Sequence, residues 1–351
     1  MVSAQRPHDI CVSDSPRTLI LSQDYELFFQ DSGSVESCLI KPCDALLHFA
    51  DANDARFTFF IDAGMLLAMQ RYADEEPALA AELKLVREHI SMLAERGHEI
   101  ALHVHPHWED TVRVNGEWRF GGTRYQLRSF DDADILGIFR RYSAILNELS
   151  GARPTSYRAG GFCVEPFSKI APALSELGIQ IDSSVVPGAT LHDPEKGFDF
   201  SSAPDEAFWE FTESPGIVAA GGEFLQIPIT PQVLPQLFYW GRLVERLGPK
   251  AISRKFGDGT SKAIGRSEII RRLAMASRVA ELSMDDAKAP HLLKKRNWSQ
   301  QRDVWHVMGH PKLASDRSID TLKRFIERVR IEKIDTVSGF AARCRDCESG
   351  C

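Results

Sequence analysis

Short apolar runs that end in polar residues recur along the chain, and they predict the strands of a sheet. The first run is 18–22, TLILS, and the second is 56–62, which is rich in aromatic and β-branched residues and ends at Asp62. A third run, centred on Ile100 and Leu102, follows Gly97. Short apolar runs bounded by turn or polar residues are typical of strands that are buried on both faces.

Helical periodicity separates these runs. Apolar residues recur at helical spacing at Leu79, Leu83, Val86, Ile90 and Leu93. Gly97 follows them, and glycine is common just past the end of a helix. Further helices are predicted from Pro42 to Ala52 and from Asp131 to Leu149. Strands and helices in regular succession predict an α/β protein with a parallel sheet and right-handed crossovers.

Three later segments also place a chemically active residue at the end of a candidate strand. Arg158 precedes the glycine pair Gly160 and Gly161, which lets the backbone approach a ligand closely. Asp182 follows an apolar run, and His310 ends the run VWHVMG. Ligands of α/β folds bind at the carboxyl ends of the strands, so we expect these residues to gather there.

Two carboxylates follow the first strand in the sequence SQDYELF. Asp24 and Glu26 are two residues apart, and residues at that spacing on an extended segment face the same way. They are therefore expected to converge on one point.

Three histidines follow the third strand. His103, His105 and His107 alternate, so they cannot all face one ion unless the chain bends, and Pro106 supplies a bend. The favoured metal pair is His103 and His107, with His105 pointing away. Ordinary solvated rings are the alternative, although neutral imidazole is a common metal ligand. Aromatic residues beyond this point, beginning with Trp108, are candidates for stacking on a sugar ring or for local packing.

Composition narrows the class of protein. The 351 residues are 43% hydrophobic and 26% charged, typical of a globular protein, and the net charge of −7 argues against general nucleic-acid binding. No signal segment or membrane-spanning run is evident, so a cytoplasmic location is expected. The cysteine number is odd, which fits a reducing compartment. A flexible N-terminus over 1–17 and a cysteine-containing tail over 342–351 are predicted.

The segment 231–298 interrupts the strand–helix rhythm and is predicted to be an inserted helical subdomain. Between Arg242 and Gln300 there are 14 Lys and Arg against 6 Asp and Glu, a local balance of +8 that leaves −15 for the rest. This asymmetry suggests an anionic partner, such as a nucleotide-linked sugar, a glycolipid head group or an acidic membrane surface. A solvated face packed on an acidic barrel is the alternative.

Between Thr18 and Leu322 the chain resembles the polysaccharide deacetylases, also called the NodB-homology or carbohydrate esterase family 4 group. The resemblance rests on the sequences GHEIALHVHPHW, YRAGGF, IDSS and VMGHP, in the family's order. It implies a distorted (β/α)7 barrel over 18–341, with 231–298 inserted. It also implies a divalent metal, most often zinc, and hydrolysis of an acyl group, most often N-acetyl, on a sugar or glycan precursor.

The resemblance implies a role for each matched residue. Glu26, His103 and His107 are the expected metal ligands, and a carboxylate with two imidazoles leaves an open coordination position, as catalytic zinc needs. The catalytic roles fall to Asp24 as base, oriented by Arg158, and to His310 as acid, held by Asp182. Trp108, Gly160 and Gly161 are expected to contact the substrate.

Alternatives remain at the first motif and in the function. If Gln23 occupies the base position, Asp24 becomes the metal ligand and the chain is a catalytically silent carbohydrate-binding barrel. The spacing of His103 and His105 also resembles the His-x-His pair of an amidohydrolase, which would act on a non-sugar amide. That pair normally ends the first strand, whereas here it ends the third.

Overall fold

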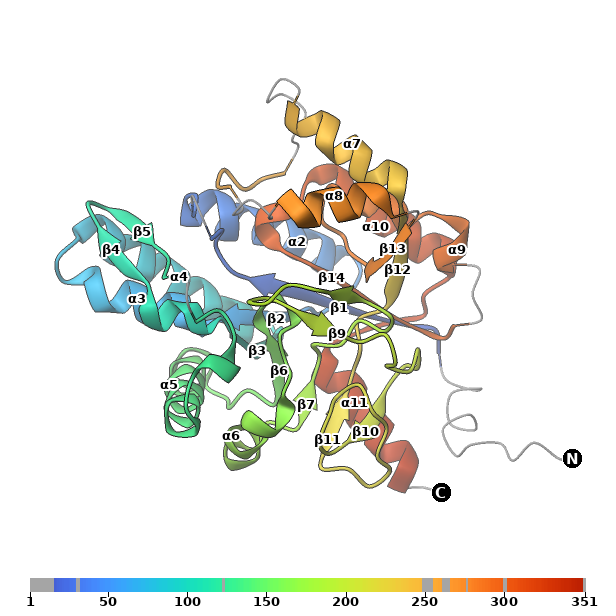
Figure 1. The fold of residues 1–351 in the computed structure, drawn as a ribbon, viewed down its shortest axis with the longest axis horizontal. Helices are drawn as coiled ribbons and strands as arrows, with labels where there is room; N and C mark the ends of the chain where they lie inside the picture. The colour runs from blue at the N-terminus through green and yellow to red at the C-terminus, as the bar shows by residue number, and fades with distance from the viewer. Residues whose placement is uncertain are drawn as a thin grey trace, which may run out of the picture.

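A nine-stranded sheet forms the centre of the molecule (Figure 1) within the described residues, which are 16–29, 32–121, 124–247, 255–260, 266–275, 277–298 and 302–349 of a computed structural model. Parallel neighbours run in the order β11-β7-β6-β3-β2-β1-β14. These strands are β1 (Thr18–Tyr25), β2 (Thr58–Asp62), β3 (Glu99–Val104), β6 (Ser156–Ala159), β7 (Ile181–Asp182), β11 (Phe224–Gln226) and β14 (Val304–Gly309). Antiparallel β10 (Trp209–Phe211) extends the β11 edge, and β15 (Lys333–Asp335) pairs with the start of β1.

The two ends of this strand order approach each other. Beyond β11, the backbone N–H of Thr230 donates to the carbonyl of His306 in β14 at 3.2 Å. The N–H of His306 in turn donates to the Thr230 hydroxyl at 2.8 Å. The sheet is therefore curled, and the predicted fold class, a distorted (β/α)7 barrel, is confirmed. Because its main strands are parallel, their carboxyl ends share one rim.

Helices cover the sheet, and among them are the helices that periodicity predicts before Gly97, over 42–52 and over 131–149. The covering helices are α2 (Lys41–Ala52), α3 (Ala63–Ala73), α4 (Pro77–Glu95), α5 (Asp132–Ser150), α6 (Ala171–Leu177), α10 (Asp316–Val329) and α11 (Val337–Ser349). The predicted apolar positions of α4 are buried, and Gly97 just beyond it has φ +79°, a conformation that favours glycine. The Asp131 carboxylate caps α5 by accepting from the Asp134 N–H at 2.8 Å.

The segment 231–298 carries helices and also a strand pair. Its helices are α7 (Gln236–Leu247), α8 (Arg266–Ala274) and the short α9 (Lys295–Trp298). The antiparallel pair of β12 (Pro231–Pro235) and β13 (Ser277–Glu281) was not predicted. Because prolines lie at both ends of β12, the periodicity of the sequence did not predict a strand there. The pair joins the insertion to the rim of the barrel, because the chain leaves β13 directly into the site described below.

The two termini are described unequally. Of the predicted flexible segment 1–17, only residues 16 and 17 lie within the described part of the chain. The segment 342–351 was predicted to be a tail, but α11 continues to Ser349. Cys344 is buried with Val337 and Phe340 against the sheet. Helical spacing of these apolar residues explains the difference. The side chains of Cys347 and Cys351 lie outside the described residues. Among the described helices, none has the length and apolar composition that crossing a bilayer requires.

Candidate functional site

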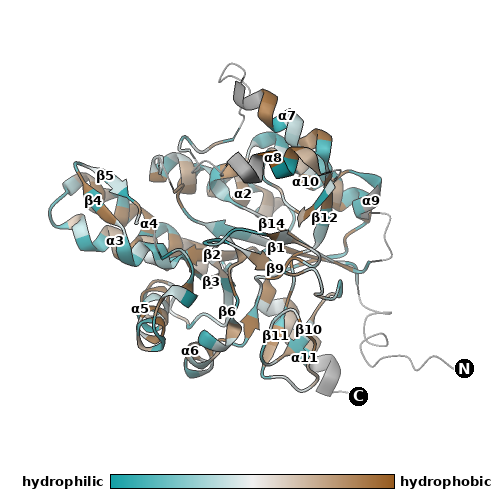
Figure 2. Cartoon of the chain, viewed as in Figure 1, coloured by the Kyte–Doolittle hydropathy of each residue, from teal (hydrophilic) through white to brown (hydrophobic). Residues whose placement is uncertain are grey.

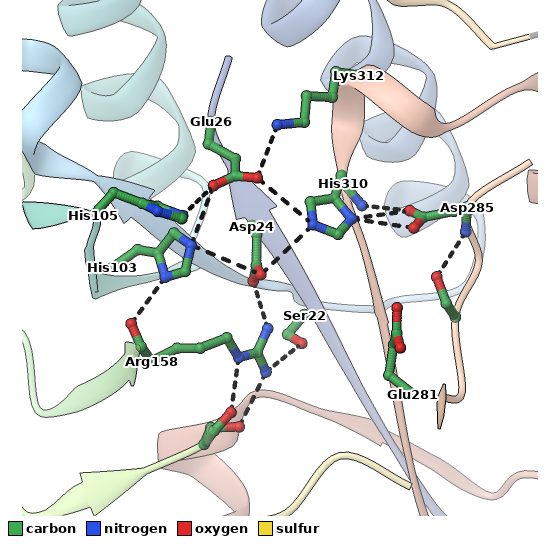
Figure 3. A network of polar contacts seen from close by, with 12 residues as sticks. Ser22, Asp24, Glu26, His103, His105, Arg158, Glu281, Asp285, His310 and Lys312 are labelled. Carbon is green, nitrogen blue, oxygen red and sulfur yellow. Dashed lines mark hydrogen bonds and ion pairs between the residues drawn. The ribbon is translucent and has the colours of Figure 1, made fainter. Parts of the chain in front are cut away.

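Alternation along β1 aims two carboxylates at the rim of the barrel. Asp24 and Glu26 both face the polar cluster drawn in Figure 3, as their spacing predicts. Gln23 faces the other way, and its amide nitrogen lies 3.0 Å from the sulfur of Met284. The side chain of Gln23 therefore does not occupy the base position at this cluster.

Glu26, His103 and His105 bring three donor atoms together. One atom from each lies within 4.8 Å of the others, and all three side chains are buried. Nε2 of His105 is 2.6 Å and Nε2 of His103 is 3.4 Å from Glu26 Oε2. Nδ1 of His103 donates to the Arg158 carbonyl at 2.9 Å, which leaves the Nε2 lone pair facing the cluster. This donor set fits a divalent metal.

The second imidazole of this cluster is His105, whereas the sequence favoured His107. The backbone stays extended through His105, so His103 and His105 lie on the same face. The turn that begins at Pro106 then carries His107 away, and its ring stacks on Tyr125 with an interplanar angle of 8°. Neither ring nitrogen of His107 has a hydrogen-bond partner among the described residues. The ligand role of His107 stays a prediction that the geometry does not favour.

Asp24 is oriented by Arg158, as expected. Nη1 of Arg158 donates to Asp24 Oδ1 at 2.6 Å, and Nη2 donates to the hydroxyls of Ser22 and Ser183 at 3.0 Å each. The guanidinium is fully buried and lies over the ring of Phe60 at 4.0 Å. With Oδ1 occupied, Asp24 presents Oδ2 to the cluster, 3.8 Å from Nε2 of His103.

His310 lies across the cluster from Arg158, and its partner is Asp285. Asp285 accepts from the His310 backbone N–H at 2.9 Å and lies 3.2 Å from Nδ1. Nε2 of His310 points at the two carboxylates, 3.9 Å from Asp24 and 3.7 Å from Glu26. Burial alone would lower the pKa of His310, but Asp285, followed by Asp24 and Glu26, raises it above its usual value.

The partnership predicted for Asp182 is therefore corrected. Asp182 accepts from the backbone N–H and the hydroxyl of Ser184 at 2.9 and 2.8 Å, and burial raises its pKa to about 6. Asp285 follows β13, and a bridge between Ser283 and Met308 holds this stretch beside β14. Since β13 itself was not predicted, nothing in the sequence linked Asp285 to His310.

Sequence reasoning also missed Lys312, two residues after His310. Its ammonium donates to Glu26 Oε1 at 2.8 Å and to the Leu27 carbonyl at 2.7 Å, and the side chain is buried. Burial alone would raise the pKa of Glu26, but Lys312, then His105 and His103, lower it well below its usual range. Lys312 thus keeps Glu26 ionised and fixes one of its oxygens, which leaves Oε2 for the cluster.

Replacing Lys312 with Met is expected to destabilise the protein by roughly 3 kcal/mol, because it leaves a buried carboxylate without its cation. Urea unfolding measures this loss. The control is Lys323→Met, which removes the exposed pair with Asp320 and should change stability by less than about 0.5 kcal/mol. Equal stability of the two variants would contradict a structural role for the buried ion pair.

Of the residues predicted to contact substrate, Trp108 and Gly160 are buried and Gly161 is exposed. Trp108 is 1% exposed and its indole donates to Asp62 at 2.6 Å, so it has no free face for a sugar. A Cβ at Gly160 would lie 2.4 Å from Nδ1 of His105, and one at Gly161 would lie 2.7 Å from the Tyr125 hydroxyl. The close approach expected of the two glycines is present, and it leaves room for the side chains of His105 and Tyr125.

Comparisons with known proteins give only structural neighbours. No family model matches the chain, and no curated protein matches it. A putative polysaccharide deacetylase from Mycobacterium smegmatis is 15% identical, with 96% of this chain and 92% of that chain covered and a TM-score of 0.47. A family 4 carbohydrate esterase from Streptomyces lividans, solved with acetate, is 11% identical, with 89% and 88% covered and a TM-score of 0.36.

A third neighbour is a CE4 family pseudoenzyme from Bacillus anthracis, 7% identical, with 93% of this chain and 66% of that chain covered and a TM-score of 0.38. Identities this low do not transfer residue roles to this chain. The structural neighbours of the chain are CE4 polysaccharide deacetylases and related proteins at low sequence identity, and its site holds a buried Glu/His/His set suited to a divalent metal.

Proposed function

We propose that this protein is a metal-dependent hydrolase that removes an acyl group, in the first instance N-acetyl, from a sugar or glycan precursor. One observation carries the proposal: a candidate base and a candidate acid flank a single donor cluster, and each is oriented by its own buried partner. Arg158 holds Asp24, and Asp285 holds His310. A base and an acid that are each oriented by a separate partner are typical of hydrolytic sites.

Glu26, His103 and His105 are the residues proposed to hold the metal, with zinc as the first choice. A bound divalent metal supplies a Lewis acid and lowers the pKa of water towards ~7. Because His103 is fixed through Nδ1 and Glu26 through Oε1, the two are oriented before any metal arrives.

Asp24 is proposed to accept a proton from the attacking water on Oδ2, while Arg158 keeps the carboxylate in place through Oδ1. His310 is proposed to donate a proton from Nε2 to the departing amine. Asp285 at Nδ1 keeps the ring oriented and favours its charged form, which is the form that can donate. Oδ2 of Asp24 and Nε2 of His310 are 3.9 Å apart and belong to different strand ends, so one group can accept the proton of the water while the other donates to the leaving amine.

The sugar part of the proposal rests on the sequence resemblance carried by the histidine, arginine and final-histidine motifs. An N-acylated sugar of a glycan precursor is the proposed substrate class, and a cytoplasmic location remains part of the same proposal. The choice of zinc and the choice of an N-acetyl group are both open to direct measurement.

The test is release of acetate from N-acetylated sugars and their oligomers by the purified protein, before and after removal of metal with a chelator. We expect release that is lost with the metal and restored by adding zinc. Metal binding with no release from any N-acylated sugar would favour a catalytically silent carbohydrate-binding barrel. Hydrolysis confined to non-sugar amides would instead favour an amidohydrolase.

Replacing Asp285 with Asn is expected to lower kcat and to move the alkaline limb of its pH profile to lower pH. The acid must be protonated during turnover, and Asp285 raises the pKa of His310, so its removal makes His310 lose its proton at lower pH. The fall in kcat should be smaller than the ~10²–10⁴-fold expected when the acid itself is removed. Asp182→Asn is the matched comparison and should leave that limb in place. A limb that moves with Asp182 and not with Asp285 would overturn the assignment.

A further inference from the structure

Helix α7 presents an apolar stripe to solvent. Leu237 is 80% exposed, Trp240 46% and Val244 66%, and their spacing of three and four residues puts them on one face of the helix. Ile270 of the neighbouring α8 is 66% exposed, and Met275 just beyond it is 41% exposed. Figure 1 shows α7 at the outer edge of the molecule, and Figure 2 shows hydrophobic and hydrophilic residues interleaved along it.

The opposite side of α7 holds the helix on the protein. Phe238 and Tyr239 are half-buried. The ring centroids of Phe238 and His291 are 5.3 Å apart. The side chain of Gln236 donates to the carbonyl of Leu273 in α8. The helix is therefore docked through one face, and its apolar stripe is an additional surface that stays exposed in the described part of the chain.

The chain segment that begins within α7 has a strongly positive net charge. The segment from Arg242 to Gln300 carries +8, while the rest of the chain carries −15. Among its described residues, Arg242, Lys294 and Lys295 are exposed. An anionic surface attracts this part of the molecule and repels the remainder, so the charge distribution orients the protein with α7 towards it. A helix with apolar and tryptophan residues on one face beside basic residues is typical of helices that lie in a membrane interface.

We propose that the exposed face of α7 and α8 docks on the surface of a bilayer that contains anionic lipid. Leu237, Trp240 and Val244 enter the interface, and the basic residues of the insertion contact the lipid head groups. Docking of this kind needs no membrane-spanning helix. The inference concerns binding alone, so it stands or falls independently of the reaction proposed for the barrel.

The experiment is co-sedimentation of the full chain with two kinds of vesicle, one of phosphatidylcholine alone and one of phosphatidylcholine mixed equally with phosphatidylglycerol. We expect binding to the mixed vesicles that weakens as salt is added, with little binding to neutral ones. The double variant L237E/W240E should bind the mixed vesicles at least about tenfold less. A second double variant, K294E/K295E, should also bind less while leaving the apolar stripe intact.

The matched control is I217E/V218E, which changes two other exposed apolar residues, 64% and 48% exposed, outside the basic segment. It should bind as the wild type does, and circular dichroism should show all variants folded. Equal loss in the control, equal binding to both vesicle types, or no binding at all would overturn the proposal. Vesicle binding by none of the proteins together with a wild-type dimer that L237E/W240E dissociates would assign the face to a second copy of the chain.

Discussion

Replacing Asp24 with Asn is expected to lower turnover by about 10²–10⁴-fold while bound metal is retained. Asn keeps the shape of the side chain but cannot accept the proton of the attacking water. Arg158 loses its ion pair with Asp24 yet keeps its bonds to Ser22 and Ser183, so the site should stay assembled. The measurement is kcat for acetate release, with metal content and thermal unfolding determined on the same sample.

The control for Asp24→Asn is Asp320→Asn, which alters an exposed carboxylate on α10 and should leave turnover unchanged. A variant that keeps most of its turnover would show that Asp24 is not the base. A variant that loses its metal would make Asp24 a ligand. It would also favour the alternative in which Gln23 occupies the base position, despite its contact with Met284.

The second large effect is expected at the histidines. His105→Ala should weaken metal binding by more than about 100-fold, because even partners outside the ligand set cost ~10–100-fold. His107→Ala should have a much smaller effect, since its ring packs against Tyr125 and meets the His105 ring edge-on, with 5.3 Å between the ring centroids, without adding a nitrogen to the donor set. Competition with a chromophoric chelator measures both affinities on proteins of equal purity.

The opposite ranking would contradict this part of the site. If His107→Ala loses the metal and His105→Ala keeps it, the turn at Pro106 rearranges when metal binds, and the ligand pair expected from the sequence is the true one. A loss confined to His107 would also assign His105 to holding Glu26, to which its Nε2 is 2.6 Å away.

Much of the fold and half of the site were accessible from the sequence because they depend on local regularities. The alternation of β1 placed Asp24 and Glu26 on one side, and the order of strand ends brought Arg158 and His310 to the same rim. These predictions used only strand periodicity and the shared direction of parallel strands, which do not depend on side-chain packing.

The remaining parts depend on tertiary structure that no local pattern encodes. Asp285 reaches His310 through a strand pair that closes a long insertion, and Lys312 reaches Glu26 across 286 residues of chain. His105 joins the cluster because the backbone stays extended for one residue past β3. Trp108 was expected at the rim but is buried against α3, where Gly64 leaves room for it.

The measurement that tests the central claim most directly is the number of metal ions bound per chain in the wild type, Glu26→Gln and Asp24→Asn. With Glu26 as ligand and Asp24 as base, the wild type and Asp24→Asn should each carry metal, whereas Glu26→Gln should carry almost none. Metal retained by Glu26→Gln and lost from Asp24→Asn would contradict the assignment of the two carboxylates, and with it the proposed hydrolysis.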